Sequence, residues 1–147
     1  MGSRNNNALF FTCSLIEYIG REQKQKRKDI VTYLGKDAVG RIYEYADVFH
    51  CEPIAKVAEE FIEEYHIPTG TFDNEKECQY EIPDYWTIGE VYERLIEDVG
   101  TDETIVETLM QVYQSWIDDF LSDYNIAVYY QSREYIAACY EEGTILD

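Results

Sequence analysis

Apolar residues recur every three to four positions through the first half of the chain, the spacing that places them on one face of an α-helix. Asn7 precedes the first of these runs and is a predicted N-cap, because its side chain can accept a hydrogen bond from a free backbone amide. Gly35 follows a short run and is a predicted left-handed cap. Pro53 suits the first turn of a later helix. The predicted helices of this half cover residues 8–22, 29–34, 38–49 and 53–65.

The second half shows the same helical spacing and further capping signals. Thr87 and Glu90 have the spacing of a capping box, in which the hydroxyl and the carboxylate each bind a free backbone amide. Asp102 is a predicted N-cap of the longest helix, whose apolar face is wide enough for a central place in the core. Ser132 and Gly143 are predicted to begin and end the last helix. The predicted helices cover residues 88–99, 103–124 and 133–142, and residues 126–130 are predicted to be extended.

Pro68, Gly70 and Pro83 interrupt the apolar pattern between the halves, where we expect an irregular connector with a turn or a short hairpin. The sequence therefore predicts an all-α fold, a single bundle of about six to seven helices with an irregular connector at 66–85. Each half alone would bury little surface, so we expect one domain. The domain covers residues 1–147, with an N-terminal half at 8–66, a connector at 67–85 and a C-terminal half at 86–143.

The composition fits a globular protein. The chain has 147 residues, of which 46% are hydrophobic, and this is enough for one well-buried core. No stretch of about 18 uncharged apolar residues is present, so we expect no association with a membrane. The apolar run at 8–16 lacks the small-residue cleavage site of a signal peptide, and the four cysteines are widely spaced with no CxxC pair. We therefore predict a cytoplasmic location.

The charge is large and unevenly distributed. The formal net charge is −18, with 30 acidic and 12 basic residues. Residues 1–41 contain eight basic and four acidic residues, whereas the remaining 106 residues contain 4 basic and 26 acidic ones. So much negative charge disfavours DNA and acidic membranes as partners and favours the capture of cations. The charge pattern therefore predicts a basic protein partner.

Two histidines lie at a spacing that favours metal binding. Asp47 and His50, like Glu63 and His66, are three positions apart, as in the Glu-x-x-His motifs of carboxylate-bridged di-iron bundles. In an antiparallel helix pair, however, the two motifs would lie about 20 Å apart at 1.5 Å per residue. We therefore predict no metal site, and since no glycine-rich phosphate loop is present we expect no cofactor. The alternative is a small helical metal-dependent enzyme that uses His50, His66 and nearby carboxylates.

Residues 21–28 form a basic run ahead of two predicted helices, an order similar to that of helix-turn-helix proteins. The helix that would read the DNA carries Asp37, Glu44 and Asp47, which phosphates would repel. We interpret the run as a solvated loop or as an internal partner for acidic helices, and we predict no nucleic-acid binding.

The remaining surface chemistry suits a protein partner. Fourteen tyrosines are present, and tyrosine offers rigid contact area with a polar tip that tolerates water before binding. No catalytic motif is recognised, so we predict a non-enzymatic interaction module whose acidic helices dock a basic protein. The oligomeric state stays open. The predicted partner-binding residues are Glu59, Glu60, Glu63, Glu64, Tyr65 and Tyr92.

Residues 42–50 read IYEYADVFH, and residues 55–62 read AKVAEEFI. This segment resembles a family of small uncharacterised bacterial helical domains, in which a Tyr and a Leu-His or Phe-His pair precede a helix of this kind. The resemblance covers residues 8–65. Some such domains are similar to partners of neighbouring toxin-like ADP-ribosyltransferase proteins. The resemblance therefore implies an antitoxin-like, neutralising or regulatory role, and it supplies no catalytic residue.

Overall fold

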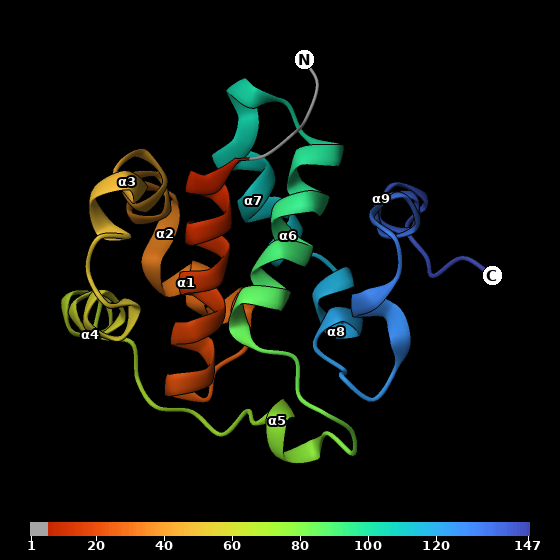
Figure 1. Cartoon of the computed structure of the whole chain (residues 1–147), viewed down its shortest axis with the longest axis horizontal. Coiled ribbons are helices and arrows are strands. Elements are labelled where there is room, and N and C mark those ends of the chain that lie inside the picture. Colours follow the sequence, from red (N-terminus) through yellow and green to blue (C-terminus); the bar gives the residue numbers. More distant parts are fainter. Residues whose placement is uncertain (1–5) are drawn as a thin grey trace.

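The structure is a computed structural model that describes residues 6–147, and in that range it contains helices and loops but no strand (Figure 1). The prediction of an all-α fold is confirmed. None of the described helices is both long and apolar enough to cross a bilayer. The α-helices are α1 (Asn7–Gln23), α2 (Arg27–Glu44), α3 (Ala46–Phe49), α4 (Ile54–Glu64), α5 (Asn74–Glu77), α6 (Tyr85–Val99), α7 (Ile105–Tyr113), α8 (Ile117–Leu121) and α9 (Arg133–Glu142), and the 3-10 helices are η1 (Asp102–Thr104) and η2 (Ala127–Tyr130).

Helices α1 and α6 form an antiparallel pair at the centre of the bundle (Figure 1). Ser14 in α1 lies against Gly89 near the start of α6, whereas the backbone amide of Asn6, just before α1, donates to Glu97 near the end of α6. A Cβ atom at Gly89 would lie 2.2 Å from the Ser14 hydroxyl oxygen. Glycine at this position is therefore what lets the two helices approach so closely.

The other helices pack around this pair. Helix α2 contacts both α1 and α7, α3 and α4 contact α1, and α9 contacts α6. One hydrophobic core runs through all of these contacts. Because α1 belongs to the first half of the chain and α6 to the second, the two halves share that core.

Several helix ends lie where the sequence places them. Gly35 has φ 81° and ψ 164°, and it breaks the helical backbone inside α2. Pro53 directly precedes α4. The Ser132 side chain accepts a hydrogen bond from the Tyr135 amide at the start of α9, and Gly143 ends that helix in the left-handed conformation with φ 79°. These signals act within a few residues, which explains why the sequence alone reveals them.

The single long helix predicted over residues 103–124 is wrong. Thr101, and not Asp102, caps this segment through a reciprocal pair of hydrogen bonds with Thr104, and Asp102 lies inside η1. The chain then leaves the helical path between α7 and α8, where the Ser115 hydroxyl donates to the Val112 carbonyl at 2.7 Å. This local bond competes with the backbone hydrogen bonds of a continuous helix. The segment contains no glycine or proline from which the break could be predicted.

Two predicted caps are displaced by a few residues. Helix α6 begins at Tyr85, because the Asp84 carboxylate accepts a hydrogen bond from the Thr87 amide at 2.7 Å. The capping box predicted from Thr87 and Glu90 is therefore wrong. At α1, the Asn6 side chain accepts from the Leu9 amide at 3.0 Å, so the cap lies one residue before the predicted one.

The connector between the halves contains a short helix, α5, in place of a hairpin. Its first part is tied to the end of α1, because the Gly70 and Phe72 amides donate to the Gln23 and Lys24 carbonyls at 2.7 and 2.9 Å. Farther on, Ile126 is extended as predicted, but residues 127–130 form η2, so the extended conformation predicted for them is wrong.

Candidate functional site

Four predicted partner-binding residues form one surface on α4. They lie three and four positions apart, which brings them to the same side of a helix, and all four are exposed. Together with His66, they line a shallow hollow of about 400 Å³. We call this surface the acidic face, and it consists of Glu59, Glu60, Glu63 and Glu64.

One end of the acidic face is already engaged by a cation. An Arg41 guanidinium nitrogen lies 3.2 Å from a Glu64 carboxylate oxygen and donates a hydrogen bond of the same length to the Tyr65 hydroxyl. Among the described residues, Glu59 and Glu63 form no ion pair. The acidic face therefore retains carboxylates that a positively charged partner could bind.

Tyr92 does not belong to that surface. The side chain is 0% exposed, stacks on the Tyr113 ring with centroids 4.1 Å apart, and donates a hydrogen bond to Asp118. It therefore cannot contact a partner that docks on the folded protein, and its prediction as a partner-binding residue is wrong. Tyr92 lies on the apolar face of α6. A tyrosine on such a face can be buried when its hydroxyl forms a hydrogen bond within the protein.

Tyr92 instead belongs to a buried ion network centred on Arg27, the first residue of α2. Arg27 is 4% exposed; its Nε donates to Asp118 Oδ1 at 2.9 Å, and it also binds Glu17. A third nitrogen donates to the Ser122 hydroxyl at 2.8 Å. The Tyr124 hydroxyl donates to Glu17 at 2.8 Å. The buried ion network comprises Glu17, Arg27, Tyr92, Asp118, Ser122 and Tyr124.

The network stabilises the charged forms of Glu17 and Arg27. Burial would raise the pKa of the Glu17 carboxyl, but Arg27 and Arg21 outweigh burial and hold it below its ordinary value. Burial likewise opposes the charge on Arg27, yet Glu17, together with Tyr92 and Asp118, keeps its pKa well above the ordinary value. Asp118 Oδ2 is buried and has no hydrogen-bond partner in the described protein. The charged side chains of the network therefore pair with one another inside the core, where a docking partner cannot contact them.

The basic run at residues 21–28 supplies internal partners for acidic side chains, as one of its two interpretations expects. Besides Arg27, Arg21 binds Glu17, and Lys28 lies 3.5 Å from Asp119. Lys24 lies 3.5 Å from Asp73 in the connector. Arg4, which also contributes to the basic charge of this region, lies outside the described residues. The positive charge of the N-terminal region is thus largely matched within the chain.

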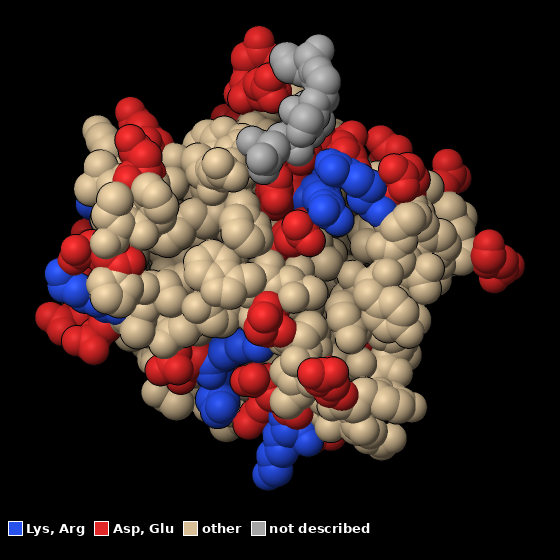
Figure 2. All heavy atoms as spheres, viewed as in Figure 1, with Lys and Arg blue, Asp and Glu red and all other residues tan. Residues whose placement is uncertain are grey.

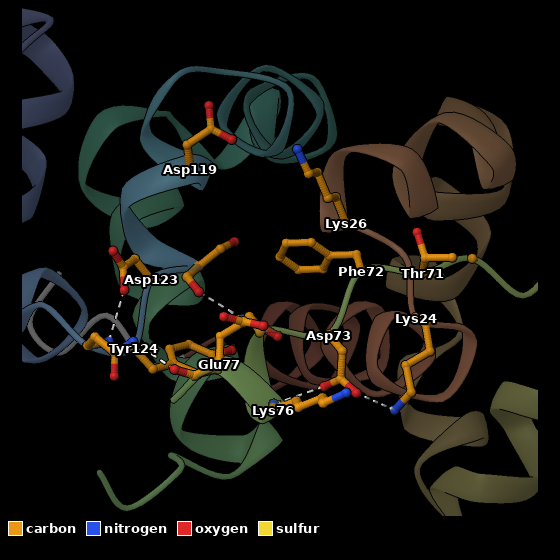
Figure 3. A pocket seen from close by; sticks show the side chains of 14 residues that line it. Lys24, Lys26, Thr71, Phe72, Asp73, Lys76, Glu77, Asp119, Asp123 and Tyr124 are labelled. Atoms are coloured by element: carbon orange, nitrogen blue, oxygen red, sulfur yellow. Dashed lines mark hydrogen bonds and ion pairs between the residues drawn. The ribbon is translucent and has the colours of Figure 1, made fainter. Parts of the chain in front are cut away.

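Part of this run lines a cavity of about 820 Å³ between the connector and α8 (Figure 3). The Phe72 ring extends into it from the side of Lys24 and Lys26, and Asp119 and Asp123 lie on the opposite wall. The Lys26 ammonium lies 5.7 Å from the centre of the Phe72 ring. Because both signs of charge line this mixed-charge cavity and several of them are already paired, it favours neither an anion nor a cation.

A second hollow, of about 620 Å³, is mostly apolar and lies where α1, α3, α4 and α6 meet. Phe10 and Trp86 form its aromatic wall, with ring centroids 5.4 Å apart, and Trp86 is 39% exposed. Ile54, the first residue of α4, also lines this hollow. We call this hollow the aromatic groove. In the view of Figure 2, a broad area without charged side chains lies left of the centre of the molecule, and both acidic and basic side chains lie around it.

The two histidines lie in different places. His50 follows α3 and lines the aromatic groove, and its Nδ1 lies 3.2 Å from the Ala46 carbonyl oxygen, the kind of contact expected at a helix C-terminus. His66 follows α4 beside the acidic face. Within residues 6–147, no group of three or more His, Cys, Asp or Glu side chains is placed to hold a metal ion. The described residues therefore offer no metal site to the alternative of a metal-dependent enzyme that uses His50 and His66.

Sequence reasoning missed the buried ion network and the aromatic groove. A signal for Glu17 was present, since Cys13, Ile16 and Gly20 place it on the buried side of α1. Such a charge inside an apolar face predicts a buried partner. The groove gives no comparable signal, because its walls come from four helices that are distant in the sequence.

Comparison of the chain with protein-family models, with curated proteins and with solved structures found no match. The resemblance to small bacterial helical domains therefore stays a prediction, and arguments about function depend on the residues described above.

Proposed function

We propose that the protein is a non-enzymatic interaction module that docks a basic protein partner. The acidic face makes the charged contact, and the aromatic groove receives apolar side chains from the same partner. Helix α4 contributes to both surfaces, through its glutamates and through Ile54. The two surfaces are therefore connected through one helix.

The observation that carries this proposal is the pairing of cations within the chain. Among the described residues, nine Lys and Arg side chains form ion pairs with carboxylates. Since acidic residues outnumber basic ones by 30 to 12, a large negative surplus remains after this pairing. Surplus charge of one sign attracts an oppositely charged partner over long distances and speeds their encounter.

The aromatic groove supports a stable complex as well as a fast encounter. Charge at the rim of an interface contributes little affinity, whereas buried aromatic anchors contribute most of it. Phe10 and Trp86 offer such anchors, and Asp47 and Glu52 lie at the same hollow. We therefore infer that the partner presents apolar side chains flanked by Lys or Arg.

The proposed partner is consistent with the role that the resemblance implies. An antitoxin-like protein binds and neutralises another protein, and such a protein needs a docking surface and no catalytic group. The resemblance covers residues 8–65, and these residues include α4 and the α1 wall of the aromatic groove. The antitoxin-like or regulatory role is thus part of the proposal.

The test is a capture experiment from lysate of the native cell at low salt. The bait variant reverses the acidic face with Glu59→Lys, Glu60→Lys, Glu63→Lys and Glu64→Lys. Lysines near the C-terminus of α4 suit the helix dipole, so the fold is expected to persist. A matched control reverses four exposed carboxylates on and after α9, with Glu134→Lys, Glu141→Lys, Glu142→Lys and Asp147→Lys.

We expect wild type and the α9 control to capture the same basic protein, and the α4 variant to lose it. Circular dichroism establishes that both variants remain helical. Capture that is equal for all three baits, or lost equally in both variants, contradicts a specific role for the acidic face.

A further inference from the structure

A third hollow, of about 760 Å³, lies between the residues that precede α6 and those that follow α8. Four tyrosines line it, and two of them, Tyr80 and Tyr130, are each 68% exposed. Ile82 and Ile126, also exposed, complete its apolar surface. We call this hollow the tyrosine cavity. It groups four of the large hydrophobic residues that the described surface exposes, which is unusual for a surface with no binding role.

Three of the tyrosine rings pack on one another, and hydrogen bonds join the two segments of the chain that line the cavity. Tyr129 packs edge-to-face on Tyr124 at 5.6 Å and on Tyr130 at 5.1 Å between ring centroids. The Asn125 side chain joins the two walls, because it accepts a hydrogen bond from the Gln79 amide at 2.7 Å and donates to the Glu77 carbonyl at 2.9 Å. The cavity is therefore largely formed before any ligand arrives.

Two carboxylates lie in the same cavity. Glu81 and Asp84 both line it. A hydrogen bond from the Thr87 amide holds the pKa of Asp84 below its ordinary value, so this carboxyl stays ionised near neutral pH. Among the described residues, neither carboxylate forms an ion pair. Aromatic faces combined with unpaired carboxylates favour an organic cation over an anion or a neutral apolar group.

Arg21 lies behind this cavity, and its guanidinium is already engaged. Its guanidinium lies 5.7 Å from the centre of the Tyr124 ring, donates to the Pro83 carbonyl at 2.7 Å and binds Glu17 and Glu75. A guanidinium therefore already packs on one tyrosine of this wall from inside the protein. Arg27 over the Tyr92 ring repeats the arrangement in the core.

We propose that the tyrosine cavity receives an arginine side chain of the basic partner, with its guanidinium stacked on tyrosine and bound by Glu81 or Asp84. Arginine suits this site better than lysine because its planar guanidinium stacks on rings and binds carboxylates through two parallel hydrogen bonds. The proposal deepens the proposed function and rests on it, since it names a chemical group of the partner and a second place of contact.

The test uses the whole protein and a defined peptide probe, acetyl-Gly-Arg-Gly-Arg-Gly-amide. A peptide with citrulline at both Arg positions serves as a neutral control of the same shape, and a Lys peptide tests charge alone. Binding is followed by NMR of the isoleucine methyl groups. Ile82 and Ile126 report on the tyrosine cavity, and Ile62 reports on α4.

We expect the Arg peptide to shift the Ile82 and Ile126 signals at concentrations at which the citrulline peptide does not, and the Lys peptide to bind at least threefold more weakly. Tyr130→Leu and Glu81→Gln should each weaken binding of the Arg peptide at least threefold. Tyr33→Leu changes an exposed tyrosine elsewhere and should leave binding unchanged.

Equal binding of the Arg and citrulline peptides overturns the arginine proposal, as does binding of the Arg peptide that shifts Ile62 and leaves Ile82 and Ile126 unchanged. That second result leaves the acidic face as a cation-binding surface, so the proposed function would survive it. Conversely, if reversal of the acidic face does not affect capture of the partner, while the Arg peptide still binds in the tyrosine cavity, the role of α4 is overturned and the arginine proposal is not.

Discussion

Arg27 and Asp118 are 91 residues apart in the chain, yet Arg27 Nε and Asp118 Oδ1 are joined by a hydrogen bond of 2.9 Å inside the core. Arg27 begins α2 and Asp118 lies in α8, so the bond connects the two halves of the protein. Glu17 of α1 binds the same guanidinium. One cation thus pairs with two buried carboxylates, and the loss of that cation has a predictable cost.

We expect Arg27→Leu to lower the free energy of unfolding by about 3–5 kcal/mol, because it removes the cation that pairs with buried Asp118 and leaves Glu17 with Arg21 as its cation. Urea denaturation at neutral pH measures this change. Lys28→Leu is the matched control, since Lys28 is partly exposed and pairs with the exposed Asp119, and it should cost about 1 kcal/mol or less. Similar losses for both variants would show that Arg27 neutralises no buried charge.

The pH dependence of stability should show the contribution of Glu17. Its folded pKa lies below the ordinary value of 4.5 because Arg27 and Arg21 outweigh the effect of burial. The contribution is therefore present above about pH 4.5 and is lost as the pH falls through the lower folded pKa. We expect Glu17→Gln to be less stable than wild type at neutral pH and to lose less stability on acidification. Unfolding at several values between about pH 7 and pH 3 tests this, and an unchanged acid slope would contradict it.

Glu93 should act in the opposite direction. Burial and the neighbouring Glu97 raise its pKa from 4.5 to about 7. The folded state therefore favours the protonated form, and the associated stability is present below about pH 4.5 and lost as the pH rises through about 7. Arg133 binds Glu97 from α9, and the Asn6 amide faces both carboxyl groups.

Glu93→Gln removes this ionisation. We expect it to be more stable than wild type by about 1 kcal/mol at about pH 8, with a smaller difference at about pH 5, after allowing for screening by solvent. Thermal unfolding at the two pH values measures the difference. Glu141→Gln, an exposed substitution on α9, controls for the general loss of one negative charge. A gain that is equal at both pH values would contradict the assignment to Glu93.

The close approach of α1 and α6 gives a prediction at Gly89. An alanine Cβ there would lie 2.2 Å from the Ser14 hydroxyl oxygen and 2.9 Å from the Ser14 Cα, so backbone as well as side chain must move. We expect Gly89→Ala to destabilise the protein by about 1–3 kcal/mol or more. Gly40→Ala in α2 meets no atom within 4 Å and should stabilise it by about 0.5–1 kcal/mol. Thermal denaturation compares the two, and equal effects would refute the contact.

Local signals in the sequence predict the helices well. Gly35, Ser132 and Gly143 reveal helix boundaries because each acts through its own backbone angle or a cap within three residues. The all-α class follows from apolar spacing for the same reason. The break before α8 has no such marker, since a serine hydroxyl that binds a nearby carbonyl looks like any surface serine.

The candidate sites also differ in whether local sequence signals can predict them. The acidic face is predictable because its four glutamates share one helix and need only the 3.6-residue period to come together. The burial of Tyr92 is not evident from the sequence, because it depends on the hydrogen bond that its hydroxyl donates to Asp118 of another helix. The aromatic groove and the tyrosine cavity depend on which helices pack together, and side-chain spacing along one helix carries no information on that.

The affinity of the purified partner for the acidic face is the most direct test of how this protein works. We expect reversal of Glu59, Glu60, Glu63 and Glu64 to weaken binding at least tenfold at low salt, equivalent to about 1.4 kcal/mol, and to remove most of its salt dependence. The reversed α9 control should bind within about threefold of wild type, since its charges lie away from the contact. Equal affinities for both variants, measured by isothermal titration calorimetry, would contradict docking through α4.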